Sequence, residues 1–475
     1  MNPTPVLYES VAAELAAMLH DGVLRPGERL PSVRQLSAQK RVSVSTVLQA
    51  YRTLEDNGLI YARPQSGYFV RARSLRQPPE PALTAPPDTA SLVGVSALVA
   101  ENLVARKNRN MVSLGEACPS PDLLPAARLR RLMSALALRN PQALTTYAFP
   151  PGNEALRRQI ARRSIGMGCR LGVDDIVITD GCMEALNLCL RAVAKPGDTI
   201  AFESPTYYGL LQIVESLGMK ALEIPTHPRD GISLEALELA TRKRRVKACV
   251  VMPTIANPLG SVMPDENKAR LVELLAARNI PLIEDDVYGD LHYSHTRPLA
   301  AKAYDKAGLV LLCSSFTKAL APGFRVGWVA PGRFRAQVEM LKFITTVATP
   351  DILQSTVAEF LNTGGYDRHL RIVRKVFANQ VARVSDAVAE YFPAGTQITR
   401  PQGGFVLWLA LPARYDTTRL RKQALAENIN FMPGGMFTNS KKLYRNAMRL
   451  SCGLPWSDRI DQALRRLGEL ARAQR

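Results

Sequence analysis

Apolar residues over the first 73 positions recur at helical spacing, with short polar breaks between the runs. One amphipathic helix is predicted by apolar residues three or four positions apart: Leu7, Val11, Leu15 and Met18. Ser32 can cap a second helix over residues 33–39. A third helix is expected from Ser45, and these residues share one of its faces: Val44, Val47, Tyr51 and Leu54. Residues 59–72 then alternate like two short strands around a turn at 64–67.

Three helices followed by a hairpin have the element order of a winged helix-turn-helix, which binds DNA. A small helical bundle used for dimerisation would show the same helical pattern. The pattern alone therefore leaves both interpretations open for residues 1–73.

The composition changes at Gln77, because residues 77–87 include five prolines. Such a run cannot form a core and is typical of a semi-rigid linker. A short helical connection is expected over residues 91–107. We therefore predict an N-terminal domain over residues 1–73, a linker over 74–109 and a second domain over 110–475.

The second domain alternates short apolar runs with helical patterns. Seven of the runs are continuous and rich in β-branched residues, which suits strands that are buried on both faces. They are residues 175–180, 198–204, 220–226, 247–254, 280–286, 309–316 and 324–330. The intervening helices predict an α/β fold with a mostly parallel seven-stranded sheet. Ligands of such sheets bind beyond the carboxyl ends of the strands.

Polar and aromatic residues follow several of these runs. Residues 181–183 open a helix whose backbone amides can hold a phosphate, although such junctions are also common without a ligand. Tyr207 can lie on a planar ligand or pack in the core, and Asn257 can donate to a ligand oxygen or simply form a turn. Asp285, with Tyr288 three residues later, can cap a helix, bind a metal or hold a cation on a cofactor.

Lys318 follows the sixth run, with Ser315 three residues before it and Arg325 seven residues after it. A lysine near a buried sheet has a lowered pKa and can act as a Schiff-base nucleophile. A single lysine is more often a surface residue, so this interpretation depends on the whole set of residues at the strand ends.

The net charge of the chain bears on the class of partner that it binds. The chain has 61 Lys and Arg against 42 Asp and Glu, a net charge of +19 and a pI of about 9.8. This excess favours a polyanion such as DNA, although a basic surface without that role is the alternative. The seven cysteines form no CxxC and the five histidines no HExxH, which argues against zinc.

Two further patterns bear on the compartment. The N-terminus lacks the basic start and apolar core of a signal peptide. No apolar run approaches the length of about 18 residues that a membrane span needs. Together with scattered free thiols, which fit a reducing compartment, these patterns predict a cytoplasmic protein without a membrane partner.

Residues 22–70, from "GVLRPGERLPSVRQL" to "SGYFV", closely resemble the DNA-binding domain of the GntR family. The resemblance implies that Arg34 approaches the DNA backbone. It implies that the start of the third helix reads the major groove with Ser43, Ser45 and Thr46. It also places the wing tip in the minor groove, with these residues at or beside the tip: Arg63, Gln65, Ser66 and Gly67. Many relatives carry an arginine where this chain has Val44, so we expect readout through hydroxyls, the wing and DNA shape.

Over about residues 110–470, the order and spacing of the strand-end residues resemble fold type I pyridoxal 5'-phosphate (PLP) enzymes, the aspartate-aminotransferase-like class. The resemblance implies that Lys318 forms the internal aldimine with PLP and that Asp285 pairs with the ring nitrogen. It implies that Tyr288 and Asn257 bond to the phenolic oxygen of the ring and that Tyr207 stacks on its face.

The same resemblance implies the rest of the site. The phosphate cup consists of Gly181, Cys182, Met183, Ser315 and Arg325. Arg449, in "MRLSCG", binds the α-carboxylate of an amino acid. Tyr147 reaches the phosphate of the neighbouring subunit, which implies a homodimer. A large subdomain is expected over about 145–350, and a small α+β subdomain over about 351–475 with 110–144. Relatives often have glycine where Ala117 or Cys118 stands, so substrate contacts there are left open.

A GntR-type domain joined to an aminotransferase-like domain resembles the MocR/GabR subfamily of GntR regulators. The resemblance implies a bacterial transcriptional regulator that senses PLP, an amino acid or an amine through Lys318. It also implies a dimer that binds repeated half-sites in double-stranded DNA. One alternative is a working aminotransferase with a DNA-binding appendage, because no expected site residue is missing. Another is a sensor of PLP without an amino ligand, in which Arg449 would lack an obvious role.

Overall fold

The computed structural model describes residues 7–20, 24, 27–56, 59–63, 66–70, 78–95, 108, 110–243, 246–440 and 442–474. The chain divides into two compact units. The smaller unit is Met1–Gln77 with Ala382–Tyr391, and the larger is Pro78–Val381 with Phe392–Arg475.

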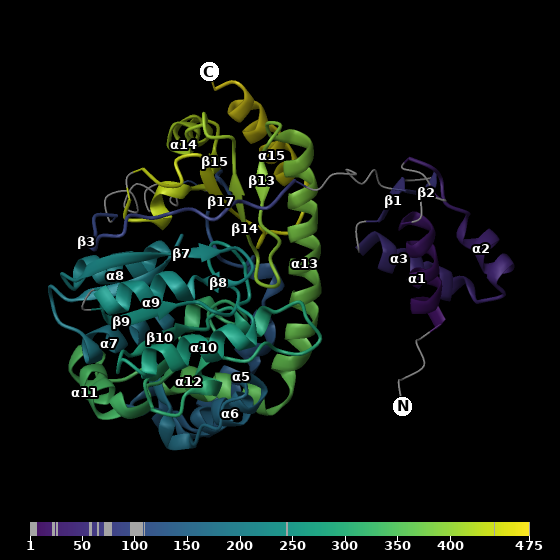
Figure 1. Cartoon of the computed structure of the whole chain (residues 1–475). Helices are drawn as coiled ribbons and strands as arrows, with labels where there is room; N and C mark the ends of the chain where they lie inside the picture. The colour runs from purple at the N-terminus through teal and green to yellow at the C-terminus, as the bar shows by residue number, and fades with distance from the viewer. Residues whose placement is uncertain are drawn as a thin grey trace. The chain divides into compact units, whose positions relative to one another are not determined.

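The smaller unit contains three helices and a hairpin, coloured purple in Figure 1. The elements are α1 (Leu7–His20), α2 (Val33–Lys40), α3 (Val44–Asp56), β1 (Ile60–Arg63) and β2 (Gly67–Val70). The two strands are antiparallel, with Arg63 opposite Gly67. Ser32 caps α2 as predicted, because its hydroxyl accepts from the backbone of Gln35 and the Gln35 side chain accepts in return.

The third helix begins one residue earlier than predicted, at Val44. Ser43 provides the cap, because its hydroxyl accepts from the backbone amide of Thr46 at 3.1 Å. The expected apolar residues further along this helix are buried: Val47, Tyr51 and Leu54. Val44 is instead 51% exposed, because the first helical residue lies beyond the edge of the core.

All seven predicted strands are present in the larger unit. They are β5 (Val177–Thr179), β6 (Thr199–Ser204), β7 (Lys220–His227), β9 (Val246–Val251), β10 (Leu282–Asp285), β11 (Val310–Ser315) and β12 (Gly327–Ala330). Among the described residues, two short strands extend the sheet to nine: β3 (Ser91–Leu92) and β8 (Gly231–Ile232). The order is β3-β7-β6-β9-β10-β11-β12-β5, with β8 paired to β7. Neighbours from β7 to β11 are parallel, and β12 is antiparallel to both of its neighbours.

The expected helix over residues 91–107 is wrong at its start. Residues 91–92 form β3, which pairs with the edge strand β7. The side chain of Asn439 also holds this segment, by donating to Ser91 Oγ at 2.7 Å and to the Leu92 carbonyl at 2.9 Å. Residues 96–107 lie outside the described part of the chain.

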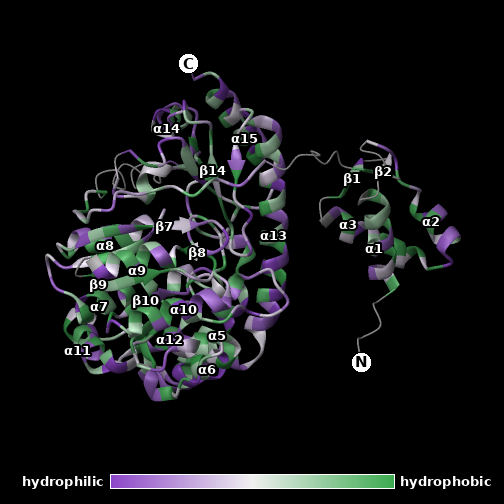
Figure 2. Ribbon diagram, viewed as in Figure 1, coloured by the Kyte–Doolittle hydropathy of each residue, from purple (hydrophilic) through white to green (hydrophobic). Residues whose placement is uncertain are grey.

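Helices cover both faces of the sheet (Figure 1). They are α5 (Ala126–Arg139), α6 (Glu154–Ser164), α7 (Cys182–Val193), α8 (Tyr208–Ser216), α9 (Leu234–Lys243), α10 (Asp265–Ala276), α11 (Arg335–Thr346) and α12 (Asp351–Asn362). Ile200 and Phe202 belong to a core cluster with residues of α7 and α8, whereas Ala201 belongs to a cluster with residues of α9 and α10. Alternate residues of β6 thus enter opposite cores, as expected for a strand that is buried on both faces. Figure 2 shows hydrophobic residues gathered around β9 and β10.

The C-terminal part is α+β, as expected. Strands β13 (Gln397–Ile398), β14 (Val406–Ala410), β17 (Ala447–Ser451) and β16 (Met432–Pro433) form an antiparallel sheet. β15 (Ile429–Asn430) pairs with β4 (Val112–Ser113), so residues near 112 join the C-terminal part. The remaining helices are α13 (Gly365–Tyr391), α14 (Thr417–Ala426) and α15 (Asp458–Arg472).

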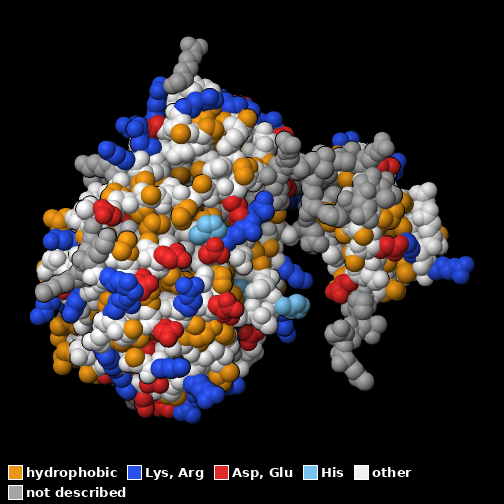
Figure 3. All heavy atoms as spheres, viewed as in Figure 1, with side chains coloured by type: hydrophobic (Ala, Val, Ile, Leu, Met, Phe, Trp, Pro, Cys, Tyr) orange, Lys and Arg blue, Asp and Glu red, His pale blue; other side chains and the backbone are white. Residues whose placement is uncertain are grey.

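No helix in the described ranges has the length and apolar composition needed to cross a membrane. On the visible face of the larger unit, Lys and Arg side chains are scattered among Asp and Glu rather than gathered in one patch (Figure 3). The net positive charge of the chain therefore does not define a docking surface on this face.

Candidate functional site

The carboxyl ends of β10 and β11 and the N-terminus of α7 border a cavity of about 150 Å³. Nine of the predicted cofactor-binding residues line it: Cys182, Met183, Tyr207, Asn257, Asp285, Tyr288, Ser315, Lys318 and Arg325. These residues come from positions that are up to 143 apart in the chain, between Cys182 and Arg325. The fold therefore assembles in one place the residues that the strand-end argument selected one by one.

Lys318 lies three residues beyond the end of β11 and is half-buried. Its Nζ donates to the carbonyl of Ala117 at 2.6 Å and lies 5.9 Å from the centre of the Tyr288 ring. Burial lowers the pKa of Lys318, and the nearby guanidinium of Arg449 lowers it further. A lowered pKa increases the fraction of neutral amine, the form that attacks a carbonyl carbon.

Asp285 ends β10 and is 2% exposed. Its Oδ1 accepts from the backbone amide of Val287 at 3.1 Å and from the Cys182 thiol at 3.4 Å. Burial raises the pKa of Asp285 to about 6. The Tyr288 hydroxyl is buried and has no hydrogen-bond partner in the described structure. A buried unpaired hydroxyl is costly, so this part of the cavity suits a ligand with a polar atom.

The N-terminus of α7 makes a close approach to Arg325. Gly181 precedes this helix with a φ of 83°, and a Cβ at Gly181 would lie 2.5 Å from Nη2 of Arg325. The Arg325 guanidinium donates to the carbonyl of Asp180 at 3.1 Å. Ser315, at the end of β11, is 7% exposed and accepts from the backbone amide of Thr317 at 3.2 Å. Free amides at a helix start, together with a guanidinium, make a binding site for a phosphate.

Arg449 is fully buried on β17. It donates to Asn257 Oδ1 at 3.0 Å and to the carbonyl of Gly115 at 2.5 Å, while its Nε has no partner among the described residues. The ring of Phe437 lies 5.0 Å from the guanidinium carbon. A buried guanidinium that meets only neutral acceptors is poorly compensated, so it favours a bound anion.

Tyr147 does not enter the cavity of its own chain. It is 72% exposed, and its ring lies 5.4 Å from that of Phe149. Phe149 in turn lies 6.0 Å from Phe343 of α11. Within one chain, Tyr147 therefore belongs to an exposed aromatic surface.

The structure leaves the expected DNA-contacting residues accessible. Arg34 is exposed on α2, and the hydroxyl of Ser43 lies 2.8 Å from that of Ser45 and 2.7 Å from that of Thr46. Arg63 is exposed at the end of β1, 4.8 Å above the ring of Phe69. Ser66 and Gly67 are exposed at the wing, and Gln65 lies outside the described residues.

Sequence reasoning missed two basic residues beside these sites. Arg29 lies against the wing, since a Cβ at Gly67 would lie 3.3 Å from its Nε. Lys342 on α11 is 1% exposed, and its Nζ contacts Glu184 at 2.8 Å and Asp180 at 3.2 Å, directly behind the start of α7. Lys342 stands neither at a strand end nor in a motif. Arg29 lies within the quoted stretch 22–36, but its contact with the wing joins residues distant in sequence, so no local signal indicated it.

The acidic residues within 284–290 have different roles. Asp285 lines the cofactor cavity, whereas Glu284 and Asp286 make structural contacts. Glu284 accepts from the backbone amides of Ala301 and Lys302, both at 2.8 Å, which is a structural role. Asp286 pairs with Arg297. In the described ranges, no group of three or more His, Cys, Asp or Glu side chains is placed to hold a metal ion.

Comparisons with known proteins agree with both units. Residues 7–70 match the model of bacterial regulatory proteins of the gntR family, and residues 109–467 match aminotransferase class I and II. The chain is 41% identical to the HTH-type transcriptional regulator YjiR of Escherichia coli, over 97% of this chain and 98% of YjiR. It is 39% identical to the HTH-type transcriptional regulator YdcR of E. coli, with 98% of each chain covered.

Solved structures match the larger part of the chain. One is LysN, an alpha-aminoadipate aminotransferase from Thermus thermophilus complexed with N-(5'-phosphopyridoxyl)-L-leucine. It is 27% identical and has a TM-score of 0.73, over 80% of this chain and 95% of LysN. Another is the kynurenine aminotransferase of Pyrococcus horikoshii, which is 29% identical with a TM-score of 0.73, over 80% of this chain and 96% of that one.

The fold and these neighbours make PLP the cofactor of the aminotransferase domain. The cavity fits it, because it offers an amine at Lys318, a buried carboxylate at Asp285, an unpaired hydroxyl at Tyr288 and a helix start beside Arg325. A GntR domain implies DNA binding, and the aminotransferase domain implies an amino compound as ligand. The chain therefore belongs to the family of HTH-type transcriptional regulators in which a GntR domain precedes an aminotransferase class I and II domain.

Proposed function

We propose that this protein is a MocR/GabR-type regulator whose affinity for DNA changes when it binds PLP, or when an amino acid or amine reaches the PLP-loaded site. One observation carries the proposal: a single chain joins a GntR domain to an aminotransferase domain, and full-length relatives are HTH-type transcriptional regulators. An effector of this kind must bind two conformations of the protein with unequal affinity, since otherwise it shifts nothing.

Each residue of the cavity has a distinct task in this proposal. PLP supplies an aldehyde that condenses with amines and a ring that withdraws electrons. Lys318 provides the reacting amine, and its lowered pKa keeps part of it neutral. Asp285 offers a buried carboxylate to the protonated ring nitrogen. Tyr288 and Asn257, which line the cavity, would bond to the phenolic oxygen, and Tyr207 would lie against the ring.

The phosphate group of PLP would lie at the start of α7. The amides of Cys182 and Met183 in the first turn of α7 would bind it, and the Ser315 hydroxyl and the Arg325 guanidinium would complete the cup. The Gly181 amide already donates to the Thr179 carbonyl at 2.9 Å, so the part of Gly181 is to leave room for Arg325. Arg449 then binds the α-carboxylate of an amino acid as a bidentate fork. Its buried position without a carboxylate partner supports this role over a sensor of PLP alone.

An exposed apolar surface supports the homodimer. Tyr147 and Phe149 join Phe343 on α11, and three further residues near them in the chain are exposed: Met340, Ile344 and Val347. Large exposed apolar residues that touch one another are typical of interfaces. In the dimer, Tyr147 would reach the phosphate of the neighbouring subunit, because its own cavity does not contain it.

On the DNA side, two copies of the GntR domain would read repeated half-sites in double-stranded DNA in the cytoplasm. Arg34 would contact the backbone, the hydroxyls of Ser43, Ser45 and Thr46 the major groove, and the wing the minor groove. The wing residues in this role are Arg63, Gln65, Ser66 and Gly67. Exposure of the described members of this set supports the assignment.

The deciding experiment measures DNA affinity of the full-length protein with and without PLP, and then with a panel of amino acids and amines. We expect the affinity to change with PLP or with an amino compound, and the change to disappear in Lys318→Ala. A response to PLP without any response to amino compounds would select the sensor without an amino ligand. Affinity that is independent of every ligand would refute regulation by this site.

The second candidate is a working aminotransferase with a DNA-binding appendage. The observation that favours it is that Lys318 and Asp285 line the cofactor cavity, while the buried Arg449 donates to Asn257 of its lining. Turnover would further require Lys318 to move a proton between the substrate and the cofactor. Release of a keto acid over many turnovers distinguishes this candidate, because a pure regulator produces at most one equivalent.

A further inference from the structure

A second and larger cavity of about 710 Å³ lies in the larger unit between the C-terminal turn of α6, the loop after η5 (Gly289–Leu291) and the start of α13. Its size falls within the range of about 300–1,000 Å³ that is usual for small-molecule sites. It shares no lining residue with the cofactor cavity. It is therefore a separate place where a ligand can bind.

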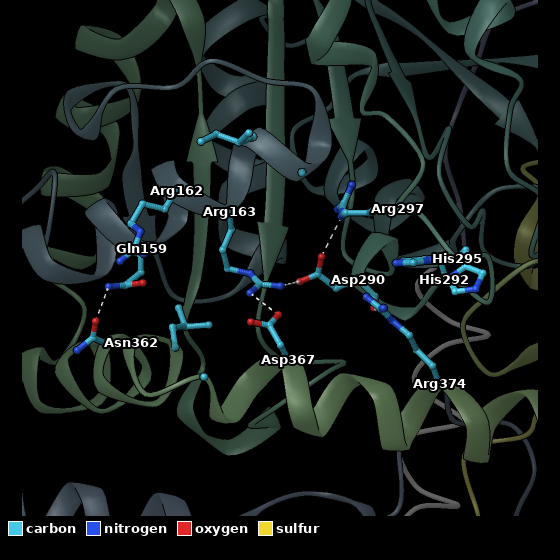
Figure 4. A pocket seen from close by; sticks show the side chains of 14 residues that line it. Gln159, Arg162, Arg163, Asp290, His292, His295, Arg297, Asn362, Asp367 and Arg374 are labelled. Atoms are coloured by element: carbon cyan, nitrogen blue, oxygen red, sulfur yellow. Dashed lines mark hydrogen bonds and ion pairs between the residues drawn. The ribbon is translucent and has the colours of Figure 1, made fainter. Parts of the chain in front are cut away.

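Guanidinium groups dominate the lining of this second cavity. Arg162 and Arg163 come from α6, Arg297 from the loop after η5, and Arg374 from α13 (Figure 4). Arg163 contacts Asp367 at 2.8 Å and Asp290 at 3.7 Å. Arg297 contacts Asp290 at 2.9 Å and also pairs with Asp286 behind the wall. Figure 4 shows Arg163 and Arg297 directed to the same carboxylate, Asp290.

Within the described part of the chain, neither of the other two arginines forms an ion pair, although the charge of Asp290 acts on Arg374. Arg374 is half-buried, and only its Nε is used, donating to the backbone carbonyl of Asp290 at 2.7 Å. Arg162 is exposed at the rim and makes no hydrogen bond or ion pair with described residues. Burial, and then the charge of Arg374, lower the pKa of His292 in the same wall to about 4. A half-buried guanidinium with two free terminal nitrogens is poorly compensated and favours an anion.

We propose that this second cavity binds a small molecule through an oxyanion, a carboxylate or a phosphate, held by Arg374 and Arg162. The planar fork of a guanidinium matches both groups. His295 and Gln159 line the same cavity and offer further donors to the rest of the ligand. The alternative is a solvated basic surface that binds no anion. Titration with anionic probes distinguishes the two.

The cavity is connected to the segment that carries Lys318. The Tyr366 hydroxyl donates to Asp290 at 2.9 Å, and the Tyr366 ring packs edge-on against Phe316 at 5.8 Å. Three residues further along α13, the His369 ring nitrogen Nε2 lies 2.8 Å from the Ala319 carbonyl. Phe316 and Ala319 flank Lys318. An anion held by Arg374 acts next to the bond from Arg374 Nε to the Asp290 carbonyl. Its effect can pass from Asp290 through Tyr366 to the segment that carries Lys318, so we expect it to shift the visible spectrum of bound PLP.

Calorimetric titration of the PLP-loaded full-length protein with inorganic phosphate and, separately, with succinate tests the site. PLP loading occupies the phosphate cup, so phosphate that still binds lies outside the cup. Arg449 stays open to a carboxylate after PLP loading, so the succinate titration is made in an Arg449→Gln background. We expect Arg374→Gln and Arg162→Gln each to weaken binding about tenfold or more, the effect of losing one charge-assisted contact. Arg419→Gln, an exposed arginine of α14 outside the cavity, is the matched control and should bind normally. Preference for one probe identifies the ligand as a phosphate ester or a carboxylate.

Three outcomes would overturn the proposal. If neither phosphate nor succinate binds, the proposed site does not exist. Unchanged affinity in both Arg374→Gln and Arg162→Gln places the anion elsewhere, and loss of binding only in Arg325→Gln places it in the cofactor cup. Arg162→Gln changes an exposed side chain without partners, so its result does not depend on correct folding of Arg374→Gln. Binding with no change in the visible spectrum would refute the coupling to Lys318. The proposal does not depend on the regulatory function, since none of these readouts involves DNA.

Discussion

The two units of the chain handle charge in opposite ways. Among the described residues of the smaller unit no charged side chain is buried, and its core is made of apolar residues from three helices and a hairpin. The larger unit buries many charged groups, among them Glu203, Asp285, Lys342 and Arg449. A surface that reads a polyanion needs only accessible groups on a stable core. A site that binds a reactive cofactor needs charged groups that are buried away from water, because burial shifts their pKa values.

The largest expected effect concerns the most reactive buried group. Lys318→Ala removes the only side-chain amine among the described residues that line the cofactor cavity. We expect complete loss of the visible absorbance that PLP acquires when it is bound to a lysine. Spectra of wild-type and variant proteins after incubation with PLP and desalting provide the measurement. A variant that keeps this absorbance would show that another lysine carries the cofactor.

The next effect tests whether buried charge governs the stability of the larger unit. Glu203 is 4% exposed, accepts from the Met252 amide at 2.7 Å, and burial raises its pKa to about 7 from the usual 4.5. The folded state thus holds this proton more tightly than the unfolded state. Its contribution to the free energy of unfolding is full below pH 4.5 and is lost as the pH rises through about 7.

Glu203→Gln should therefore match wild type near pH 4 and exceed its free energy of unfolding by about 3 kcal/mol at pH 8. Urea unfolding at both pH values measures the difference. Glu273→Gln, at an exposed position of α10, is the control and should change little at either pH. Equal stability of the Glu203→Gln variant and wild type across this range would contradict the pKa assignment.

A smaller effect distinguishes recognition of a ligand's carboxylate from recognition of its amine. Arg449→Gln should weaken the response of bound PLP to amino acids by about 2 kcal/mol, the usual value of hydrogen bonds to a charged group. An amine without a carboxylate should respond equally in both proteins. Titrations followed by absorbance measure both ligands, and Arg449→Lys should recover part of the affinity by restoring the charge. Equal losses for both ligands would mean that Arg449 only supports the fold.

The smallest expected effect concerns the smaller unit, which contains the GntR domain. Arg34→Ala should weaken binding to all DNA sequences alike and reduce the slope of log affinity against log salt by about one phosphate contact. Filter binding or fluorescence anisotropy at several salt concentrations measures this slope. Arg400→Ala, an exposed arginine of the larger unit, is the control. A sequence-selective loss for Arg34→Ala would place this residue on bases instead.

Local patterns predicted most of the fold. The Ser32 cap and the seven apolar runs are properties of neighbouring residues, and both were predicted from the sequence. The two-residue strands β3 and β8 were missed because two residues carry no periodicity. Val44 shows the limit of a periodic argument, since the first turn of a helix can extend past the core.

The candidate site divides in the same way. Asp285 ends β10 and Lys318 follows β11 by three residues, at the edge of the sheet where topology brings residues together. The partners that tune them could not be predicted, because those contacts join distant parts of the chain. Examples are the Ala117 carbonyl at Lys318, the Gly115 carbonyl at Arg449, and the pairing of Asp290 with Arg163 and Arg297.

The hydrogen bond from Lys318 to Ala117 has a consequence for how the site signals. An amine that condenses with an aldehyde gives up N–H hydrogens, so the Ala117 carbonyl loses its donor when the cofactor is captured. Two residues earlier, the Gly115 carbonyl accepts from the arginine that awaits a carboxylate. One short stretch of backbone thus accepts from both residues that would meet the ligands, Lys318 and Arg449. It is also the part of the site that lies nearest in sequence to the N-terminal unit.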